Sequence, residues 1–213
     1  MMECRNLLKW LYANQKKIIN KMKITDNIDF IHIPKTGGSA IGHIFKSKYK
    51  ALNHELPNSG NDHLYRFCFI RNPVHRFISA FEQQNKLVRR NIHAKWYLRK
   101  RIVKLNFNFK DFINSLTPEE IDENTLFYPM VKWIDGYKYD YIGRFETFDE
   151  DVYKILDATN YLNKLKNLRK MNVSKKQPIE YYIDEETFNK IIFLYKKDFE
   201  KFNYSMNIND YID

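Results

Sequence analysis

The clearest indication of the fold is the sequence Ile28-Asp29-Phe30-Ile31-His32-Ile33-Pro34-Lys35-Thr36-Gly37-Gly38-Ser39. Its first six residues are mostly β-branched, aromatic or apolar, which predicts a short buried strand closed by Pro34. After the two glycines, apolar residues recur at helical spacing and predict a helix over residues 40–48. The segment is therefore expected to be a strand–loop–helix unit.

The same pattern recurs along the chain. Residues 66–70 predict an apolar strand, Asn72 is suited to cap a helix, and Pro73 suits the first turn of that helix. Residues 139–145 predict a third strand, with a helix over 149–159 behind it. Further helices are expected at residues 85–104, 109–116 and 184–202, and a capped helix start at 117–120. This alternation predicts an α/β protein: a P-loop-like three-layer fold with a central parallel sheet flanked by helices.

The loop after the first strand has the composition of a phosphate cradle. Gly37 and Gly38 allow a tight turn whose backbone amides point at one anion, and a helix start adds partial positive charge. Lys35 supplies a full charge, while Thr36 and Ser39 supply hydroxyl groups. The NTPase pattern places its lysine after the glycines, whereas here the lysine precedes them.

The second candidate site follows the second strand. Arg71 stands at the carboxyl end of that strand, where its guanidinium group can grip a phosphate through two nitrogens. Arg76 and Ser79 are three residues apart and share a helix face. Ligands of parallel sheets bind at the carboxyl ends of the strands, so both loops are expected to converge on one site.

These two segments, FIHIPKTGGSA and FCFIRNPVHRFISAF, resemble the two signatures that bind 3′-phosphoadenosine 5′-phosphosulfate (PAPS) in the sulfotransferase superfamily. They are most similar to those of the carbohydrate branch, sulfotransferase family 2. The resemblance implies that Pro34, Lys35, Thr36, Gly37, Gly38 and Ser39 take the 5′-phosphosulfate, and that Arg71 and Ser79 take the 3′-phosphate. It extends more weakly to residues 141–146 and 195–199, and to residues 172–175, where Ser174 and Lys175 belong to a loop closing over the nucleotide. It implies PAPS as donor, adenosine 3′,5′-bisphosphate (PAP) as product, and no metal.

Sulfuryl transfer is an in-line displacement in which charge develops on the bridging oxygen of the leaving nucleotide, and Lys35 is the candidate to stabilise that oxygen. The acceptor hydroxyl needs a general base, for which His54 is the first candidate. His63 or a carboxylate, Glu55 or Glu82, are the alternatives, and His32 is expected in the core. One departure concerns the acceptor: Pro129-Met130 stands where the family often carries Pro-Gln.

The formal net charge of +10 favours anionic partners, but it also fits a lysine-rich surface. A basic stretch, with cations at Arg89, Arg90, Lys95, Arg99, Lys100, Arg101 and Lys104, is either an acceptor surface or a solvated helix face. The acceptor is expected to be a carbohydrate or another hydroxyl compound, and no nucleic acid is expected. Rival interpretations are a magnesium-dependent kinase, a basic nucleic-acid-binding module, and a sulfotransferase fold that binds nucleotide without turnover.

The 213 residues suit a single domain over residues 26–213, preceded by a basic helix or tail over residues 1–25. The tail is too short and too charged to span a bilayer and lacks a signal-peptide layout, so a soluble cytoplasmic protein is expected. The two cysteines, Cys4 and Cys68, make no disulfide framework, and Cys68 reads as a core residue.

Overall fold

The computed structural model describes residues 23–25, 27–45, 54, 56–57, 60, 62–89, 97–167 and 177–212. The chain divides into two compact units. The sheet unit comprises Met1–Ile70 and Trp133–Met171, and the helical unit comprises Arg71–Lys132 and Asn172–Asp213. Most of residues 1–25 lie outside the described ranges, so the expected domain boundary at residue 25 stays a prediction.

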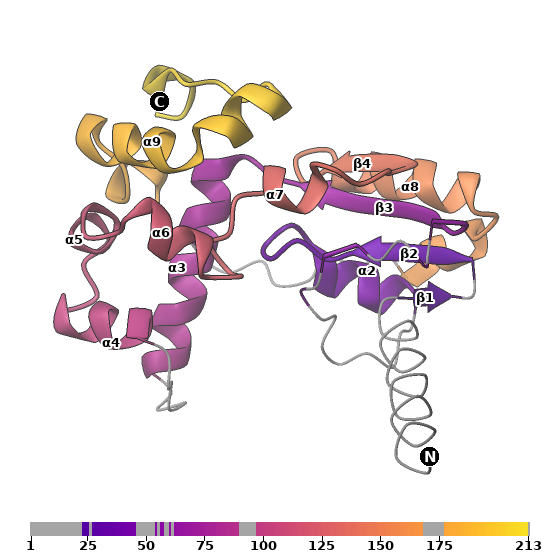
Figure 1. Cartoon of the computed structure of the whole chain (residues 1–213), viewed down its shortest axis with the longest axis horizontal. Coiled ribbons are helices and arrows are strands. Elements are labelled where there is room, and N and C mark those ends of the chain that lie inside the picture. Colours follow the sequence, from indigo (N-terminus) through magenta and orange to yellow (C-terminus); the bar gives the residue numbers. More distant parts are fainter. Residues whose placement is uncertain are drawn as a thin grey trace, which may run out of the picture. The chain divides into compact units, whose positions relative to one another are not determined.

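The sheet unit is built on four strands in the order β1-β2-β3-β4 (Figure 1). They are β1 (Lys23–Thr25), β2 (Ile28–Ile31), β3 (Tyr65–Ile70) and β4 (Tyr141–Arg144). Strands β2, β3 and β4 are parallel, with Ile31 paired to Cys68 and Cys68 to Ile142. This confirms the expected α/β fold with a central parallel sheet. The sequence did not predict β1, which pairs antiparallel with β2.

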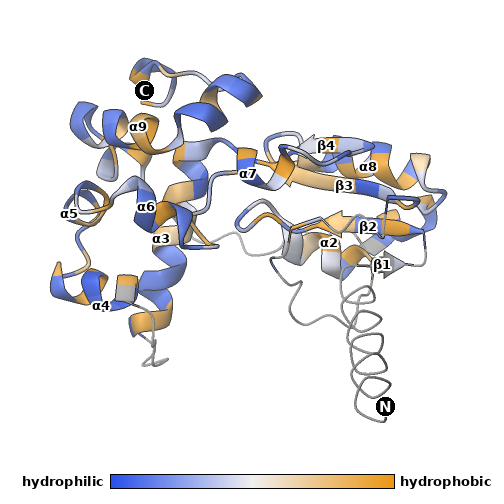
Figure 2. Cartoon of the chain, viewed as in Figure 1, coloured by the Kyte–Doolittle hydropathy of each residue, from blue (hydrophilic) through white to orange (hydrophobic). Residues whose placement is uncertain are grey.

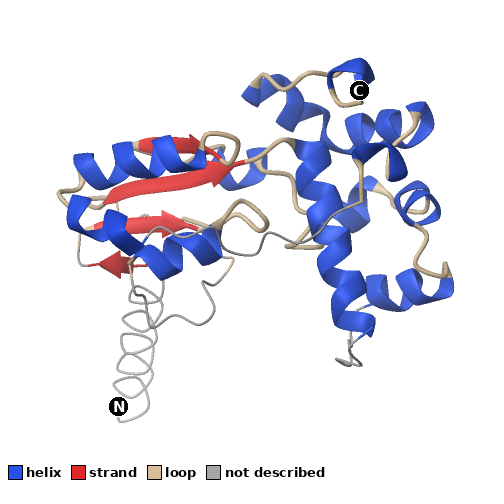
Figure 3. Ribbon diagram, turned by 180° about the vertical axis from the view of Figure 1, so that it is seen from behind, coloured by secondary structure: helices blue, strands red, loops and turns tan. Residues whose placement is uncertain are grey.

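One face of the sheet is covered by two α-helices of this unit. Side chains alternate along a strand, so Phe30, Phe67 and Phe69 point to the same face. Helices α2 (Gly38–Ile44) and α8 (Phe148–Ala158) pack there, and η2 (Leu162–Asn167) contacts both helices. Figure 3 shows the two α-helices side by side over the strands. Burial of these large apolar groups is the main force that holds the layers together.

The opposite face holds a buried ion pair between neighbouring strands. Arg66 Nε lies 2.8 Å from the Asp29 carboxylate, and Arg66 Nη1 lies 2.8 Å from Asp62. Burial lowers the pKa of Arg66, but its pairing with these two carboxylates outweighs burial and raises the pKa overall. Cys68 is fully buried on this face, as expected, and Tyr139 approaches it. The pair thus fastens β2 to β3 near their amino ends, where no site was predicted.

The helical unit is an assembly of helices around a core rich in phenylalanine. Its elements are α3 (Pro73–Arg89), α4 (Tyr97–Lys104), α5 (Phe109–Asn114), α6 (Pro118–Asp122), η3 (Ile179–Tyr181), α9 (Glu185–Phe202) and η4 (Ile208–Asp210). Helix α7 (Val131–Ile134) carries the chain back to the sheet unit. Phe77 lies at the centre of the core, with ring contacts to Phe109, Phe127 and Tyr195.

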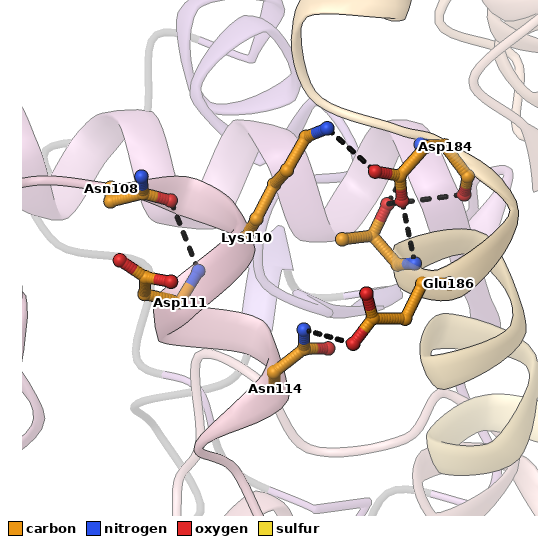
Figure 4. A network of polar contacts seen from close by, with 7 residues as sticks. Asn108, Lys110, Asp111, Asn114, Asp184 and Glu186 are labelled. Carbon is orange, nitrogen blue, oxygen red and sulfur yellow. Dashed lines mark hydrogen bonds and ion pairs between the residues drawn. The ribbon is translucent and has the colours of Figure 1, made fainter.

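Polar contacts fix the start of α9 against α5 (Figure 4). Lys110 Nζ lies 2.6 Å from the Asp184 carboxylate, and Asn114 donates a hydrogen bond to Glu186 over 2.9 Å. Asp184 also accepts a hydrogen bond from the Thr187 amide, and the Thr187 hydroxyl accepts one from the Asp184 amide, which makes a capping box. These bonds set where α9 begins and how it meets α5.

Most helices begin where the sequence predicted. Asn72 accepts hydrogen bonds from the amides of Val74 and His75, and Thr117 forms a capping box with Glu120. The helix expected over residues 85–104 differs: α3 continues to Arg89, α4 begins at Tyr97, and residues 90–96 lie outside the described ranges. Figure 2 shows the apolar character of β3, which its sequence predicted. Among the described helices, none is both long and apolar enough to cross a bilayer.

Candidate anion-binding site

The loop between β2 and α2 has an unusual backbone. Lys35 has a φ of 70° and Gly37 a φ of 98°, so both residues adopt the left-handed region. Glycine tolerates this conformation, whereas for lysine it is strained, and such strain is concentrated at functional sites. Gly37 also stands at the N-cap of α2 and brings no side chain to cap the first amides of that helix. Left-handed residues and uncapped amides at a helix start are features found in anion-binding backbone nests, so the loop is a candidate anion site.

The loop is supported from below by two aromatic rings that follow β4. A methyl group on Gly37 would lie 2.7 Å from the ring of Phe148 and 3.3 Å from that of Phe145. An open pocket of about 310 Å³ lies beside these rings, lined by residues 145–150. Position 37 therefore requires glycine for two reasons: its positive backbone angle and its close contact with the two rings.

The Phe145–Phe148 segment is held in place by Asp151, a buried carboxylate in the first turn of α8. Asp151 accepts hydrogen bonds from the Arg144 amide at 2.7 Å, the Tyr141 hydroxyl at 2.7 Å and the Thr147 hydroxyl at 2.8 Å. These bonds close the turn between β4 and α8. Asp151 consequently fixes the two rings on which the Gly37 turn rests.

The side chains of the loop have different environments. Pro34 and Thr36 are buried, Lys35 is half-buried, and Ser39 is exposed. The Thr36 hydroxyl donates a hydrogen bond to the carbonyl oxygen of Ile33 over 2.8 Å, which closes the turn internally. Lys35 and Ser39 are thus the loop side chains that the solvent reaches.

Gly38 is covered by the ring of His32, the residue after β2. A methyl group on Gly38 would lie 2.0 Å from Nε2 and Cδ2 of that ring. The His32 ring is half-buried and stacks on Phe30, with ring centroids 5.8 Å apart. His32 was expected in the core, and its contact with the glycine loop was not predicted from the sequence.

His54, the predicted general base, lies against His32. Its Nδ1 atom is 3.0 Å from the carbonyl oxygen of His32. The two imidazole rings have centroids 4.4 Å apart and planes inclined by 46°. His54 is exposed, so its ring is accessible to a substrate. The structure therefore brings the first candidate base next to the residue that covers Gly38.

The other candidate bases have other surroundings. His63 is exposed in the sheet unit. Glu82 belongs to α3 of the helical unit, where it accepts a hydrogen bond from the Tyr182 hydroxyl over 3.0 Å. Glu55 lies outside the described residues.

The remaining predicted site residues belong to the helical unit or lie outside the described residues. Arg71, bonded to the last residue of β3, is buried, and its backbone amide is 3.5 Å from Met130 Sδ. Ser79 is half-buried on α3. Met130, at the position of the departure from the family pattern, is fully buried and so is a packing residue. Ser174 and Lys175 lie outside the described residues, and their expected role stays a prediction.

Arg76 shares a helix face with Ser79 in the sequence, but its environment is internal. Its guanidinium group is buried and donates hydrogen bonds to the carbonyl oxygens of Leu126 and Tyr128. The carboxylate of Asp198, also fully buried, accepts hydrogen bonds from the amides of Met130 and Val131. Both charges thus hold the segment that carries Pro129 and Met130. The sequence pattern placed Arg76 beside Ser79 and did not indicate this internal role, and it did not single out Asp198.

The basic stretch is largely used within the fold. Arg101 pairs with both carboxylate oxygens of Glu120, Arg99 donates to Gln84, and Arg89 lies over the ring of Phe107. Lys100 and Lys104 are exposed, whereas Arg90 and Lys95 lie outside the described ranges. Among the described residues, Arg89, Arg99 and Arg101 therefore have structural contacts.

A comparison with family models gives one match: the model described as "Sulfotransferase family" covers residues 21–205. This range includes the glycine loop, His54, Arg71 and both supporting rings. No curated protein and no solved structure matches the chain.

Proposed function

The chain belongs to the sulfotransferase family, and from this membership we propose that it transfers the sulfuryl group of PAPS to a hydroxyl group, on a carbohydrate. That it is a sulfotransferase enzyme follows from the family. The donor, the acceptor class and the residue roles are our proposal. The observation that supports it most is the loop at residues 34–39, where a lysine is kept in a left-handed backbone between buried residues.

The proposed donor contacts are given separately for the two ends of the nucleotide. The amides of the Gly37 turn, the Lys35 ammonium group and the Ser39 hydroxyl are suited to the 5′-phosphosulfate, because together they supply positive charge and donors. Arg71 and Ser79 are proposed to hold the 3′-phosphate, and Ser174 and Lys175 to close over the nucleotide, on the strength of the resemblance alone. The pocket beside Phe145 and Phe148 has a volume at the lower end of the range for ligand pockets.

In the reaction, the acceptor oxygen forms a bond to sulfur while the bond from sulfur to the bridging phosphate oxygen breaks. Lys35 stabilises the negative charge that develops on that bridging oxygen. His54 Nε2 takes the proton of the acceptor hydroxyl, and PAP leaves. Every charge in this scheme is met by a group of the chain, so we propose that no metal is needed.

The first experiment measures donor binding. PAP, added with EDTA, is expected to raise the melting temperature of the protein. Lys35→Ala and Arg71→Ala should each remove most of this shift, and Arg71→Lys should keep part of it, because lysine retains the charge without the bidentate geometry. Lys138→Ala, which removes an exposed lysine of the sheet unit, is the matched control and should keep the full shift.

The same measurement separates the rival functions. An equal shift from ATP with Mg²⁺ would indicate a kinase. Tight binding of DNA or RNA with a steep salt dependence, together with no shift from PAP, would indicate a nucleic-acid-binding protein.

The second experiment measures turnover with radiolabelled PAPS and a panel of glycans. Transfer should fall by about 10²–10⁴-fold in His54→Ala, the usual contribution of a general base, while the PAP shift survives. His63→Ala is the control and should keep both the sulfuryl transfer and the PAP shift. Full transfer by His54→Ala would remove His54 from the mechanism, and PAP binding without transfer to any acceptor would favour a nucleotide-binding protein without turnover.

A further inference from the structure

We propose that His32 is a positioning residue for His54: it selects the tautomer of the His54 imidazole and fixes the ring beside the start of α2. The catalytic meaning of this inference rests on the proposed function, in which His54 is the general base. Its structural content, the tautomer and the ring position, does not depend on that function. Both residues belong to the sheet unit.

The tautomer follows from the acceptor. A carbonyl oxygen can only accept a hydrogen bond, so the His54 nitrogen that lies 3.0 Å from the His32 carbonyl must carry the proton. In neutral imidazole the other ring nitrogen then holds the lone pair. The contact with His32 therefore leaves Nε2 as the basic atom of His54, and a general base needs such a lone pair for the acceptor proton.

The ring of His32 fixes the position of His54. Gly38 contacts the His32 ring so closely that no side chain fits between them. The ring of Phe30 stacks on the His32 ring as well. The His54 ring packs against this constrained ring, with centroids 4.4 Å apart. Because Gly38 opens α2 directly after the anion-binding loop, His32 links the position of His54 to that loop.

The geometry also indicates why His54 rather than His32 is the base of the pair. The Cδ2–Nε2 edge of the His32 ring is turned toward Gly38, where a methyl group would lie 2.0 Å from both atoms. His32 is half-buried, whereas His54 is exposed. A substrate hydroxyl therefore reaches the His54 ring more readily, and His32 acts through it.

The test combines three measurements on the full chain: the tautomer of His54 from ring ¹⁵N NMR, the melting shift with PAP, and sulfuryl transfer. Wild type is expected to show His54 protonated at Nδ1 when neutral. In His32→Ala the backbone carbonyl remains, but the ring that holds the His54 imidazole against it is lost, so the His54 signal should change toward a mixture of the two tautomers. His32→Gln, which keeps a polar side chain without a ring, should show the same change in the His54 signal. It takes the place of His32→Ala if His32→Ala does not fold. His43→Ala and His63→Ala, each of which removes an exposed histidine of the same unit, are the controls.

Transfer by His32→Ala should fall roughly tenfold or more through kcat, as part of the contribution of a general base. In the His54→Ala background the same change should cost less than about twofold, because a residue that acts through His54 has nothing left to position. A merely structural role would instead give equal losses in both backgrounds.

The failures are distinguishable. If PAP gives no shift and no acceptor is sulfated, the proposed function fails, while the tautomer of His54 still tests the positioning. If wild-type His54 is protonated at Nε2, or its tautomer is the same in wild type, His32→Ala and His32→Gln, the inference about His32 is wrong whatever the protein transfers.

Discussion

The imidazole of His32 fills the space that a side chain at residue 38 would need, and a methyl group on Gly38 would lie 2.0 Å from its Nε2 atom. Two parts of the sheet unit meet at this contact: the residue that leaves β2 and the first residue of α2. The pair therefore has a mutual steric requirement that a double substitution can reveal.

Gly38→Ala is expected to destabilise the protein by about 1–3 kcal/mol, because the added methyl group must displace the His32 ring or the start of α2. In His32→Ala the space is available, so Gly38→Ala should cost less than about 1 kcal/mol in that background. Thermal unfolding of the four proteins measures this coupling. Additive losses would mean that Gly38 is constrained by something other than the ring.

Lys35→Gly and Lys35→Ala should separate stability from binding. The left-handed backbone at residue 35 costs about 1–2 kcal/mol for a residue with a Cβ atom, and glycine avoids this cost although it adds entropy to the unfolded chain. We expect Lys35→Gly to be as stable as wild type or more so, and more stable than Lys35→Ala. Both variants should lose the melting shift with PAP. A Lys35→Gly protein that still responds to PAP would show that the ammonium group is dispensable.

Asp151→Asn should make the protein less stable at neutral pH. The difference in stability from wild type should shrink as the pH falls. Burial would raise the pKa of the Asp151 carboxyl, but hydrogen bonds from the Arg144 amide, Tyr141 and Thr147 outweigh it and lower the pKa. A carboxyl with a lowered pKa stabilises the folded state above its unfolded pKa of about 4 and loses this contribution as the pH falls through the folded pKa.

The melting temperature of Asp151→Asn is therefore expected to lie below that of wild type at pH 7, with the gap closing below about pH 4. A loss of about 1–3 kcal/mol at pH 7 is the expected size for a buried acceptor with several donors. Asp149→Asn, which changes an exposed carboxylate in the same helical turn, is the control. A gap that stays constant over the whole pH range would contradict this account.

Asp198→Asn and Lys110→Ala form a contrasting pair in the helical unit. Asp198 is fully buried and accepts two backbone amides, so replacing one of its oxygens by NH₂ leaves a buried donor without an acceptor. We expect a loss of about 3 kcal/mol, measured from the unfolding midpoint in urea. The ion pair of Lys110 with Asp184 is nearly half exposed, so Lys110→Ala should cost less than about 1 kcal/mol. Equal losses would contradict the distinction drawn from burial.

The sequence predicted the parallel sheet and the glycine loop because both depend on local chemistry. A continuous apolar run marks β3, and Asn72 and Thr117 cap helices by bonds to nearby amides. Gly37 adopts a backbone angle that other residues resist. These features need only a few consecutive residues. For that reason a single sequence is enough to find them.

The features that the sequence did not predict depend on residues far apart in the chain. Arg76 donates hydrogen bonds to the carbonyl oxygens of Leu126 and Tyr128. The sequence around Arg76 contains no pattern that predicts these contacts. Likewise the contact between His32 and His54 joins residues 22 positions apart in the chain. A short strand such as β1 has too few residues for a periodic signal. It is recognised as a strand by its pairing with β2.

The support of the Gly37 turn by Phe145 and Phe148 has a consequence for biosynthesis. During translation the loop leaves the ribosome long before these rings are made, because domains complete their contacts only when all their segments have emerged. At that stage the nascent chain contains every residue of the loop but lacks the two aromatic rings that contact Gly37. The loop should therefore adopt its final shape only once β4 and the beginning of α8 have been synthesised, and a chain truncated before them would lack that shape.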